Sequence, residues 1–160
     1  MRGILSCTLL SLVVALSAAL LISADEPTPR KPVVASATVE PQAAHAGDRL
    51  SLLVRVKIGE GWHIYASDSA GPEIVTTLKL GELPKGVESA GDWIWPKSVH
   101  NQEGSSIYEG TITVRHSLRL SANAPPGAFA IPCELGYQAC NARSCRPPAK
   151  IKVTARGQAK

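Results

Sequence analysis

Three cysteines near the C-terminus are the residues best suited to carry chemistry: Cys133, Cys140 and Cys145. A cysteine thiol can form a disulfide, attack the disulfide of another protein or bind a soft metal. The fourth cysteine, Cys7, lies in an apolar N-terminal segment that we expect to be removed on export. The remaining number is odd, so in an oxidising compartment one cysteine must be unpaired, bound to a metal or paired with another chain.

Cys140 and Cys145 are separated by four residues, which is enough to close a disulfide. So small a ring stabilises the fold by only about 2 kcal/mol, and a structural disulfide would more usefully join distant strands. The neighbouring Arg143, Arg146 and Lys150 would favour a thiolate. These residues favour a redox-active pair, while a structural disulfide and a metal site stay open as alternatives on this ground alone.

Cys133 alternates with Ile131 and Leu135 along a predicted strand, so its side chain should face the core. We expect it to behave as a small buried apolar residue. A zinc or copper site could combine all three cysteines with a histidine, but their spacing differs from that of the common zinc modules. The only methionine is the initiator, which further disfavours copper. We therefore expect no metal and no dissociable cofactor.

Hydrolytic catalysis finds no support, because the chain has no Gly-x-Ser-x-Gly motif and its four histidines show no recognisable partner pattern. One of them, His116, alternates with Val114 and Leu118. We expect His116 to be a core or boundary residue whose polar atoms are satisfied.

The first 24 residues resemble an export signal. Met1-Arg2 provides a positive start, the stretch from Ile4 to Ile22 is mostly apolar, and polarity changes abruptly after Ala24. This pattern predicts a secretory signal peptide, residues 1–24, with cleavage after Ala24. The alternative is an uncleaved membrane anchor. Both place the rest of the chain outside the cytosol, where disulfides persist.

Residues 25–160 are about the size of one ordinary domain. They carry 16 Lys and Arg against 13 Asp and Glu, a net charge of +3 that is too mild and too evenly spread to indicate nucleic-acid binding. Residues 25–32 are proline-rich and predict an extended leader. We expect one domain over residues 33–156, followed by a short tail at 157–160.

Alternation of apolar and polar residues predicts strands throughout this domain, and no window shows the apolar spacing of a helix. We expect about seven short strands separated by Gly/Pro turns, which favours an all-β fold, an antiparallel β-sandwich of immunoglobulin-like topology. Pro132 lies within a strand pattern and predicts an edge or a bulge at that point. The clearest predicted strands are Leu50–Ile58, Trp62–Ala66, Thr76–Leu80, Ile107–Leu120 with a bend, Phe129–Tyr137 and a short one around Ile151 and Val153.

The residues around the cysteine pair resemble a known family. Tyr137–Pro148 contains Tyr-Gln-x-Cys, a short spacer and Cys-x-Pro-Pro, which is similar to the N-terminal periplasmic domain of DsbD, the transmembrane thiol:disulfide interchange protein. Gly61–Tyr65 and, more weakly, Ser106–Gly110 resemble two other segments of the same family. The resemblance covers roughly residues 33–155.

The resemblance implies an immunoglobulin-like domain with one redox-active disulfide between Cys140 and Cys145. Cys145 would form the mixed disulfide with partners, and Cys140 would resolve it. Two tyrosines near the family's disulfide correspond to His63 and Tyr65, so one of them is replaced here. The aromatic cap of the family would fall at residues 101–103, which contain no aromatic side chain. Tyr137 and Arg146 are further expected supporting residues.

The resemblance also implies a protein-disulfide reductase type of thiol:disulfide oxidoreductase that acts in the periplasm, in a family linked to electron transfer and cytochrome c biogenesis. Its partners would be thioredoxin-like or other thiol:disulfide proteins, and they could include a separate transmembrane electron donor. Contact with the membrane is expected only if the signal segment is retained. The alternative from another class is a non-catalytic partner-binding sandwich with a structural short-loop disulfide, and a metal-binding protein is less favoured.

Overall fold

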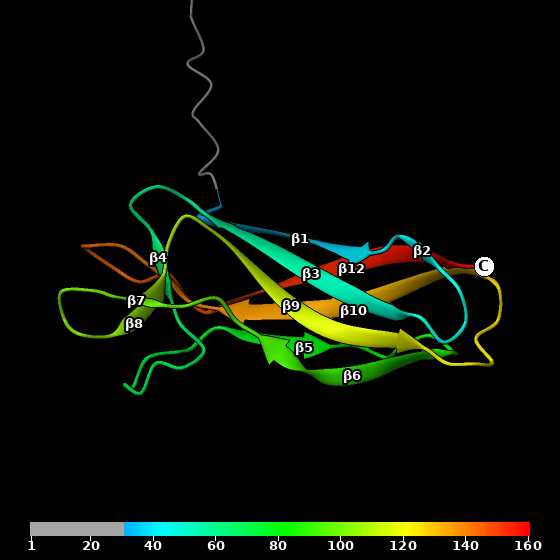
Figure 1. Ribbon diagram of the computed structural model, residues 1–160. Helices are drawn as coiled ribbons and strands as arrows, with labels where there is room; N and C mark the ends of the chain where they lie inside the picture. Colours follow the sequence, from blue (N-terminus) through cyan, green and yellow to red (C-terminus); the bar gives the residue numbers. More distant parts are fainter. Residues whose placement is uncertain (1–30) are drawn as a thin grey trace, which may run out of the picture. The chain divides into compact units, whose positions relative to one another are not determined.

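The computed structural model describes residues 31–160 (Figure 1). The expected signal peptide and all but the last two residues of the expected leader lie outside the described residues. Within 31–160 every regular element is a β-strand. No helix in this part of the chain is long and apolar enough to cross a membrane.

Two four-stranded sheets pack face to face as an immunoglobulin-like β-sandwich, which confirms the fold class expected from the sequence. All pairings in these sheets are antiparallel except the short parallel pair of β2 and β12. The first sheet has the order β1 (Val33–Glu40), β3 (Arg49–Ile58), β9 (Thr111–Leu120) and β6 (Val87–Ile94). The second has the order β2 (Ala43–Ala44), β12 (Ala149–Ala159), β10 (Gly127–Tyr137) and β5 (Thr77–Leu80).

A third, smaller sheet lies at one end of the sandwich, on the left in Figure 1. Its four strands are only two or three residues long. Cys140 lies in this small sheet, and Cys145 forms a β-bridge with it. Its order is β11 (Ala139–Cys140), β4 (His63–Tyr65), β8 (Ser106–Tyr108) and β7 (Val99–His100).

The core lies between the two main sheets and follows from the alternation of the strands. On β3 every second residue from Leu50 to Ile58 is buried, and Val114, Leu118 and Leu120 of β9 face the same interior. The second sheet contributes Ile131, Cys133 and Leu135 of β10. Each fully buried aliphatic side chain stabilises the fold by about 1.5–3 kcal/mol, so this interior determines the register of the strands that reach the site.

The expected long strand over Ile107–Leu120 is two strands in different sheets. The chain breaks at Glu109-Gly110, where Gly110 has a φ of +64°. A backbone in the left-handed region cannot continue a strand, and glycine adopts it without a steric penalty. The break sends Ile107 and Tyr108 to the small sheet and leaves β9 in the sandwich.

Two strands differ from the sequence pattern for physical reasons. The sequence pattern missed β6, because a bulge between Ser89 and Trp93 interrupts its alternation. The last strand, β12, is longer than expected and continues to Ala159, through most of the residues expected as a tail. Its inward side chains there are only alanine and glycine, which give a weak hydrophobic signal.

Pro132 lies just beyond the part of β10 that pairs with β5, which agrees with the strand edge predicted from the sequence at this residue. β5 pairs with β10 only as far as Leu80 opposite Cys133. Pro132 directs its carbonyl to the β5 side, where it accepts from the N–H of Gly81 at 2.8 Å. The nitrogen of Pro132 faces the same side, so its missing N–H costs no bond of the ladder with β12.

Candidate functional site

Cys140 and Cys145 lie directly opposite each other in a small antiparallel hairpin and form a disulfide. Their Cα atoms are 4.0 Å apart. Backbone bonds flank the pair on both sides: Arg146 N–H donates to the Ala139 carbonyl at 2.8 Å, and Asn141 N–H donates to the Ser144 carbonyl at 3.0 Å. The backbone therefore presents the two sulfur atoms to each other.

The tip of this hairpin is closed by Asn141. Its side-chain oxygen accepts from the N–H of Arg143 at 2.9 Å and from the N–H of Ser144 at 3.0 Å. Asparagine is favoured in turns because its short side chain can take the place of a backbone acceptor. The hydrogen bonds that close the four-residue spacer are thus local to the hairpin.

The strand of Cys140 is attached to the sandwich through β4. Cys140 pairs with His63, and Ala139 pairs with Ile64. Cys140 also packs with Tyr65 and Ile107 in a small apolar cluster separate from the main core. These contacts bury the side chain of Cys140.

The two cysteines of the disulfide differ strongly in exposure. Cys140 is 1% exposed, whereas Cys145 is an exposed residue. Cys145 opens onto a cleft of about 550 Å³ whose walls also include His63 and Tyr65. The loop at 101–103 and Glu109 also line the cleft. An incoming sulfur atom can therefore approach the disulfide from the side of Cys145.

The structure brings together some of the expected supporting residues. His63 and Tyr65 both line the cleft, with ring centroids 5.6 Å apart in an edge-to-face arrangement. Tyr137 does not line it: its side chain belongs to the main core, and its exposed edge borders a different groove beside Pro148. The guanidinium of Arg146 lies over the ring of Trp62, 5.4 Å from the centroid, and Arg146 does not line the cleft either.

Two acidic residues near the cleft were missed by sequence reasoning. Burial raises the pKa of Tyr65, and the carboxylates of Glu73 and Glu103 raise it further. Glu73 is held in place by a hydrogen bond from the hydroxyl of Ser105, which lowers the pKa of Glu73. Glu73 lies in the segment that follows β4, whereas Glu103 and Ser105 come from a loop distant along the chain, and no motif in the sequence links these positions.

Cys133 lies apart from this site. It is a free cysteine, 3% exposed, in the main core, which confirms the expectation of a buried thiol. Burial raises the pKa of this thiol to about 11. Within residues 31–160, no group of three or more His, Cys, Asp or Glu side chains is arranged to hold a metal ion.

The comparisons with known proteins identify the family. The family model described as "Thiol:disulfide interchange protein DsbD, N-terminal" matches residues 30–156. This chain belongs to the DsbD N-terminal family. The match spans the cysteine hairpin and the sandwich up to residue 156 of β12, in agreement with the resemblance of the short motifs. A search among curated proteins finds no match.

Among solved structures, two similar chains belong to proteins of related description. The N-terminal periplasmic domain of ScsB from Proteus mirabilis is 15% identical, with a TM-score of 0.47, and the alignment covers 76% of this chain and 44% of that one. A structure of the complex between the DsbD and PilB N-terminal domains from Neisseria meningitidis is 18% identical, with a TM-score of 0.43 and coverage of 81% and 87%. The chain thus spans less than half of the ScsB chain.

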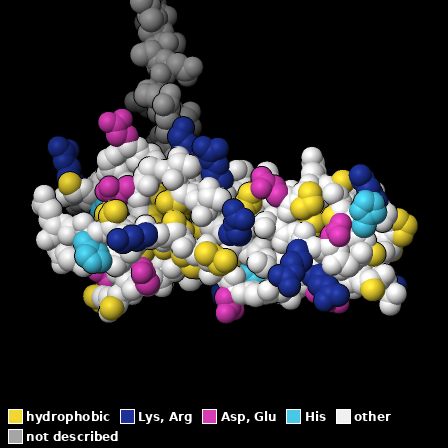
Figure 2. Space-filling model, viewed as in Figure 1, with side chains coloured by type: hydrophobic (Ala, Val, Ile, Leu, Met, Phe, Trp, Pro, Cys, Tyr) yellow, Lys and Arg dark blue, Asp and Glu magenta, His cyan; other side chains and the backbone are white. Residues whose placement is uncertain are grey.

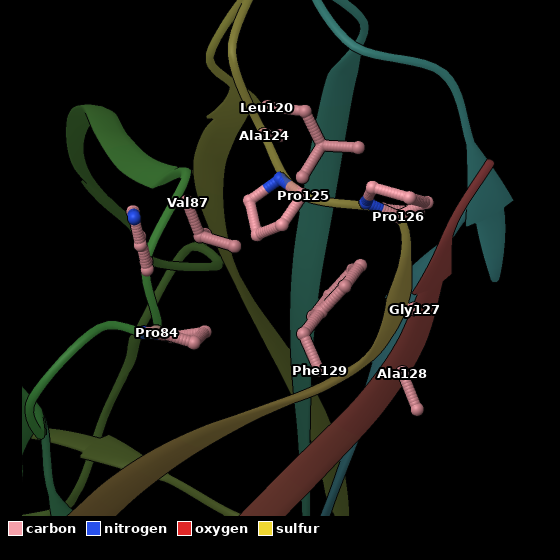
Figure 3. Close-up of a pocket in the computed structure, with 11 residues that line it drawn as sticks. Pro84, Val87, Leu120, Ala124, Pro125, Pro126, Gly127, Ala128 and Phe129 are labelled. Atoms are coloured by element: carbon pink, nitrogen blue, oxygen red, sulfur yellow. The ribbon is translucent and has the colours of Figure 1, made fainter.

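A second cavity, of about 210 Å³, lies at the opposite end of the sandwich (Figure 3). Pro125 and Phe129 project into it, and Val87 and Leu120 complete the apolar wall. Lys85 is its only ionisable lining residue, and it contains no thiol and no carboxylate. Apart from Lys85 its lining is apolar, in contrast to the cleft beside Cys145.

Proposed function

We propose that this domain is an exported thiol:disulfide exchange module that relays electrons through the Cys140–Cys145 pair. The unequal exposure of the two cysteines carries the proposal, because only one sulfur of the disulfide is open to attack. Membership of the DsbD N-terminal family supports the reaction class. Acidic and basic side chains are interspersed on the face seen in Figure 2, with no large field of one sign on that face, in keeping with a protein partner.

The reaction proceeds in two exchange steps. The thiolate of Cys145 attacks a partner disulfide, forms an intermolecular disulfide and releases one partner thiolate. The thiolate of Cys140 then attacks the sulfur of Cys145, which closes the Cys140–Cys145 disulfide and releases the second partner thiolate. Two electrons pass to the partner, and each step runs in reverse when the partner has the lower potential.

The residues of the cleft have complementary roles in this scheme. His63 lies opposite Cys140 in the β4–β11 pairing, so its imidazole can exchange a proton with the resolving thiol. Tyr65 packs on Cys140 and keeps water from that side of the disulfide. We place partner recognition at the rim of the cleft, where the loop at 101–103 carries polar side chains in place of an aromatic cap.

The location and the partners follow from the same proposal. The N-terminal pattern supports export to the periplasm with cleavage after Ala24, so the mature chain would begin at Asp25. The partners would be thioredoxin-like or other thiol:disulfide proteins, with a membrane-embedded electron donor among them. N-terminal sequencing of the exported protein tests the cleavage site directly.

The roles of the two cysteines can be tested by trapping. In a Cys133→Ala background, Cys140→Ser should form a mixed disulfide with oxidised glutathione rapidly, because Cys145 is exposed. Cys145→Ser should react slowly, because the remaining thiol is buried. Intact-mass spectrometry over time measures both, and equal rates for the two variants would overturn the assignment.

A redox titration separates this proposal from a structural short-loop disulfide. An exchange protein should have a reduction potential well above about −300 mV, the range below which structural disulfides resist the glutathione pool. A much lower potential would favour the non-catalytic partner-binding alternative.

A further inference from the structure

Gln138, Arg146 and Trp62 surround the backbone immediately after Cys145. We propose that these three residues form a clamp that keeps the Cys145 strand paired with the Cys140 strand when the disulfide is reduced. The clamp thereby lowers the reduction potential of the pair. This inference rests on the proposed function, since it concerns the same two cysteines, and it makes Arg146 a positioning residue.

Arg146 is held by three independent contacts. Its N–H donates to the carbonyl of Ala139 at 2.8 Å, and its carbonyl accepts from the side-chain amide of Gln138 at 3.0 Å. Its guanidinium lies over the ring of Trp62, 5.4 Å from the centroid. Trp62 is partly buried and packs against the main core, so it provides a fixed platform.

These contacts gain importance once the Sγ–Sγ bond is broken. The bonds at the tip of the hairpin are all made by Asn141 within its own loop and do not attach the loop to the sandwich. After Arg146 the chain continues with Pro147 and Pro148, which have no N–H to extend the ladder. Arg146 is therefore the last residue before β12 that can donate a backbone bond to hold the Cys145 strand.

The position of the Cys145 strand affects the equilibrium between the Cys140–Cys145 disulfide and the two free thiols. Reduction by glutathione converts the disulfide and two glutathione thiols into two protein thiols and one glutathione disulfide. The equilibrium constant for the reverse reaction, closure of the protein disulfide, rises with the effective concentration of one cysteine thiol at the other. A clamp that holds the two thiols together raises this concentration and so lowers the potential, by about 30 mV for each factor of ten.

Simple electrostatics predicts the opposite sign. A guanidinium beside Cys145 that acted only by stabilising its thiolate would favour the reduced form and raise the potential. Removing the charge of Arg146 would then lower the potential. The sign of the change in potential therefore distinguishes positioning from thiolate stabilisation.

The test is the equilibrium with glutathione buffers, measured by mass spectrometry after acid quenching. Arg146→Ala and Gln138→Ala should each lower the closure constant about 2–5-fold, the range expected for an exposed cation–π contact or one hydrogen bond. The double variant should lower it about tenfold. Arg146→Lys keeps the charge but stacks less well on the indole, so it should also lower the constant.

Arg143→Ala is the matched control, because Arg143 supplies only its backbone N–H to the hairpin bonds of the structure. It removes the same charge from the same loop and should not lower the closure constant. An unchanged or higher closure constant in Arg146→Ala, or an equal fall in Arg143→Ala, would overturn the clamp.

Hydrogen exchange of the reduced protein provides a second measurement. The Arg146 amide should remain protected in the reduced wild type and exchange faster in Gln138→Ala. Exchange at the rate of an unstructured amide in the reduced wild type would also overturn the inference. These experiments need no protein partner, so the clamp and the exchange function can fail separately: loss of trapping at Cys145 contradicts the function, whereas unchanged potentials contradict the clamp.

Discussion

Cys133, Cys140 and Cys145 share one chemistry but differ in surroundings. Cys133 is enclosed by the core of the sandwich, Cys140 is covered by Tyr65 and Ile107, and Cys145 faces an open cleft. A thiol must be both ionised and accessible to exchange. These environments are the basis for the proposed roles: packing for Cys133, resolution for Cys140 and attack for Cys145.

Cys133 should affect stability and leave exchange intact. Cys133→Ala removes a buried side chain and should cost about 1–2 kcal/mol in the free energy of unfolding, with an unchanged reduction potential. Urea denaturation and the glutathione equilibrium measure the two properties. In the native wild type, Cys133 should react slowly with a bulky thiol reagent, and fast native labelling would contradict its burial.

The same thiol should make the fold sensitive to alkali. Its pKa in the folded protein is about 11, above that of the unfolded chain. As the pH rises above about 9, the Cys133 thiol loses its proton in the unfolded state before it does so in the folded state. The free energy of unfolding should therefore fall between about pH 9 and 11, by up to about 3 kcal/mol. The difference in unfolding free energy between wild type and Cys133→Ala isolates this contribution. A difference that is independent of pH would contradict it.

His116 should make the fold sensitive to mild acid. It is 3% exposed, its Nε2 is 2.9 Å from the Ser89 hydroxyl, and its Nδ1 has no partner. The histidine is thus buried as expected but only half satisfied. Burial lowers its pKa, against a smaller opposing effect of Asp92.

As the pH falls, His116 is protonated in the unfolded chain before it is protonated in the folded protein. The free energy of unfolding should therefore decrease as the pH drops below about 6.5. His116→Gln should reduce this loss, as measured by urea unfolding at pH 7.5 and 5.0. Equal losses of stability in wild type and His116→Gln between these two pH values would contradict this role of His116.

At the scale of the elements, the C-terminal half of β12 joins the sandwich through very small side chains. Gly157 lies opposite Phe129 on β10, and a Cβ at this position would come within 2.9 Å of the Phe129 ring and of Val39 on β1. The glycine therefore permits the close approach of β12 to both neighbours. A larger residue would push β12 away from the core.

Gly157→Ala should accordingly destabilise the domain by about 1–3 kcal/mol. The same substitution in a Phe129→Ala background should cost less, because the ring that it would meet is absent. Chemical denaturation of the four proteins in this cycle measures the coupling. Equal costs in both backgrounds would show that the Phe129 contact is not the cause.

At the scale of the whole molecule, the redox site and the main core are separate structures. The disulfide belongs to a hairpin and a small sheet at one end, while the two large sheets share an interior that does not include Cys140. Under the proposed function, the disulfide could open and close without rebuilding the core.

Loss of the disulfide should thus be a small and local event. The Cys140→Ser, Cys145→Ser double variant should unfold cooperatively with an unchanged denaturant slope and about 2 kcal/mol less stability than the oxidised wild type. Urea unfolding measures both quantities. A loss of cooperativity or a much lower slope would contradict the separation of site and core.

The sequence by itself determined the all-β class, the identity of the cysteine pair and the burial of Cys133. Strict alternation on β3 and β10 predicted their inward faces, because a strand with one buried face repeats every two residues. The motif around Cys140 and Cys145 is local in the chain, and so is the hairpin that it forms. Local patterns of this kind can be read without knowledge of the rest of the fold.

Only the tertiary structure decided how the site is completed. The tertiary contacts decide which cysteine is open and exclude Tyr137 from the cleft. They also place Arg146 on Trp62 and bring Glu73 and Glu103 near Tyr65. The bulged β6 and the glycine- and alanine-lined end of β12 likewise carry little periodic signal. Their places follow from packing against neighbours that the sequence alone does not identify.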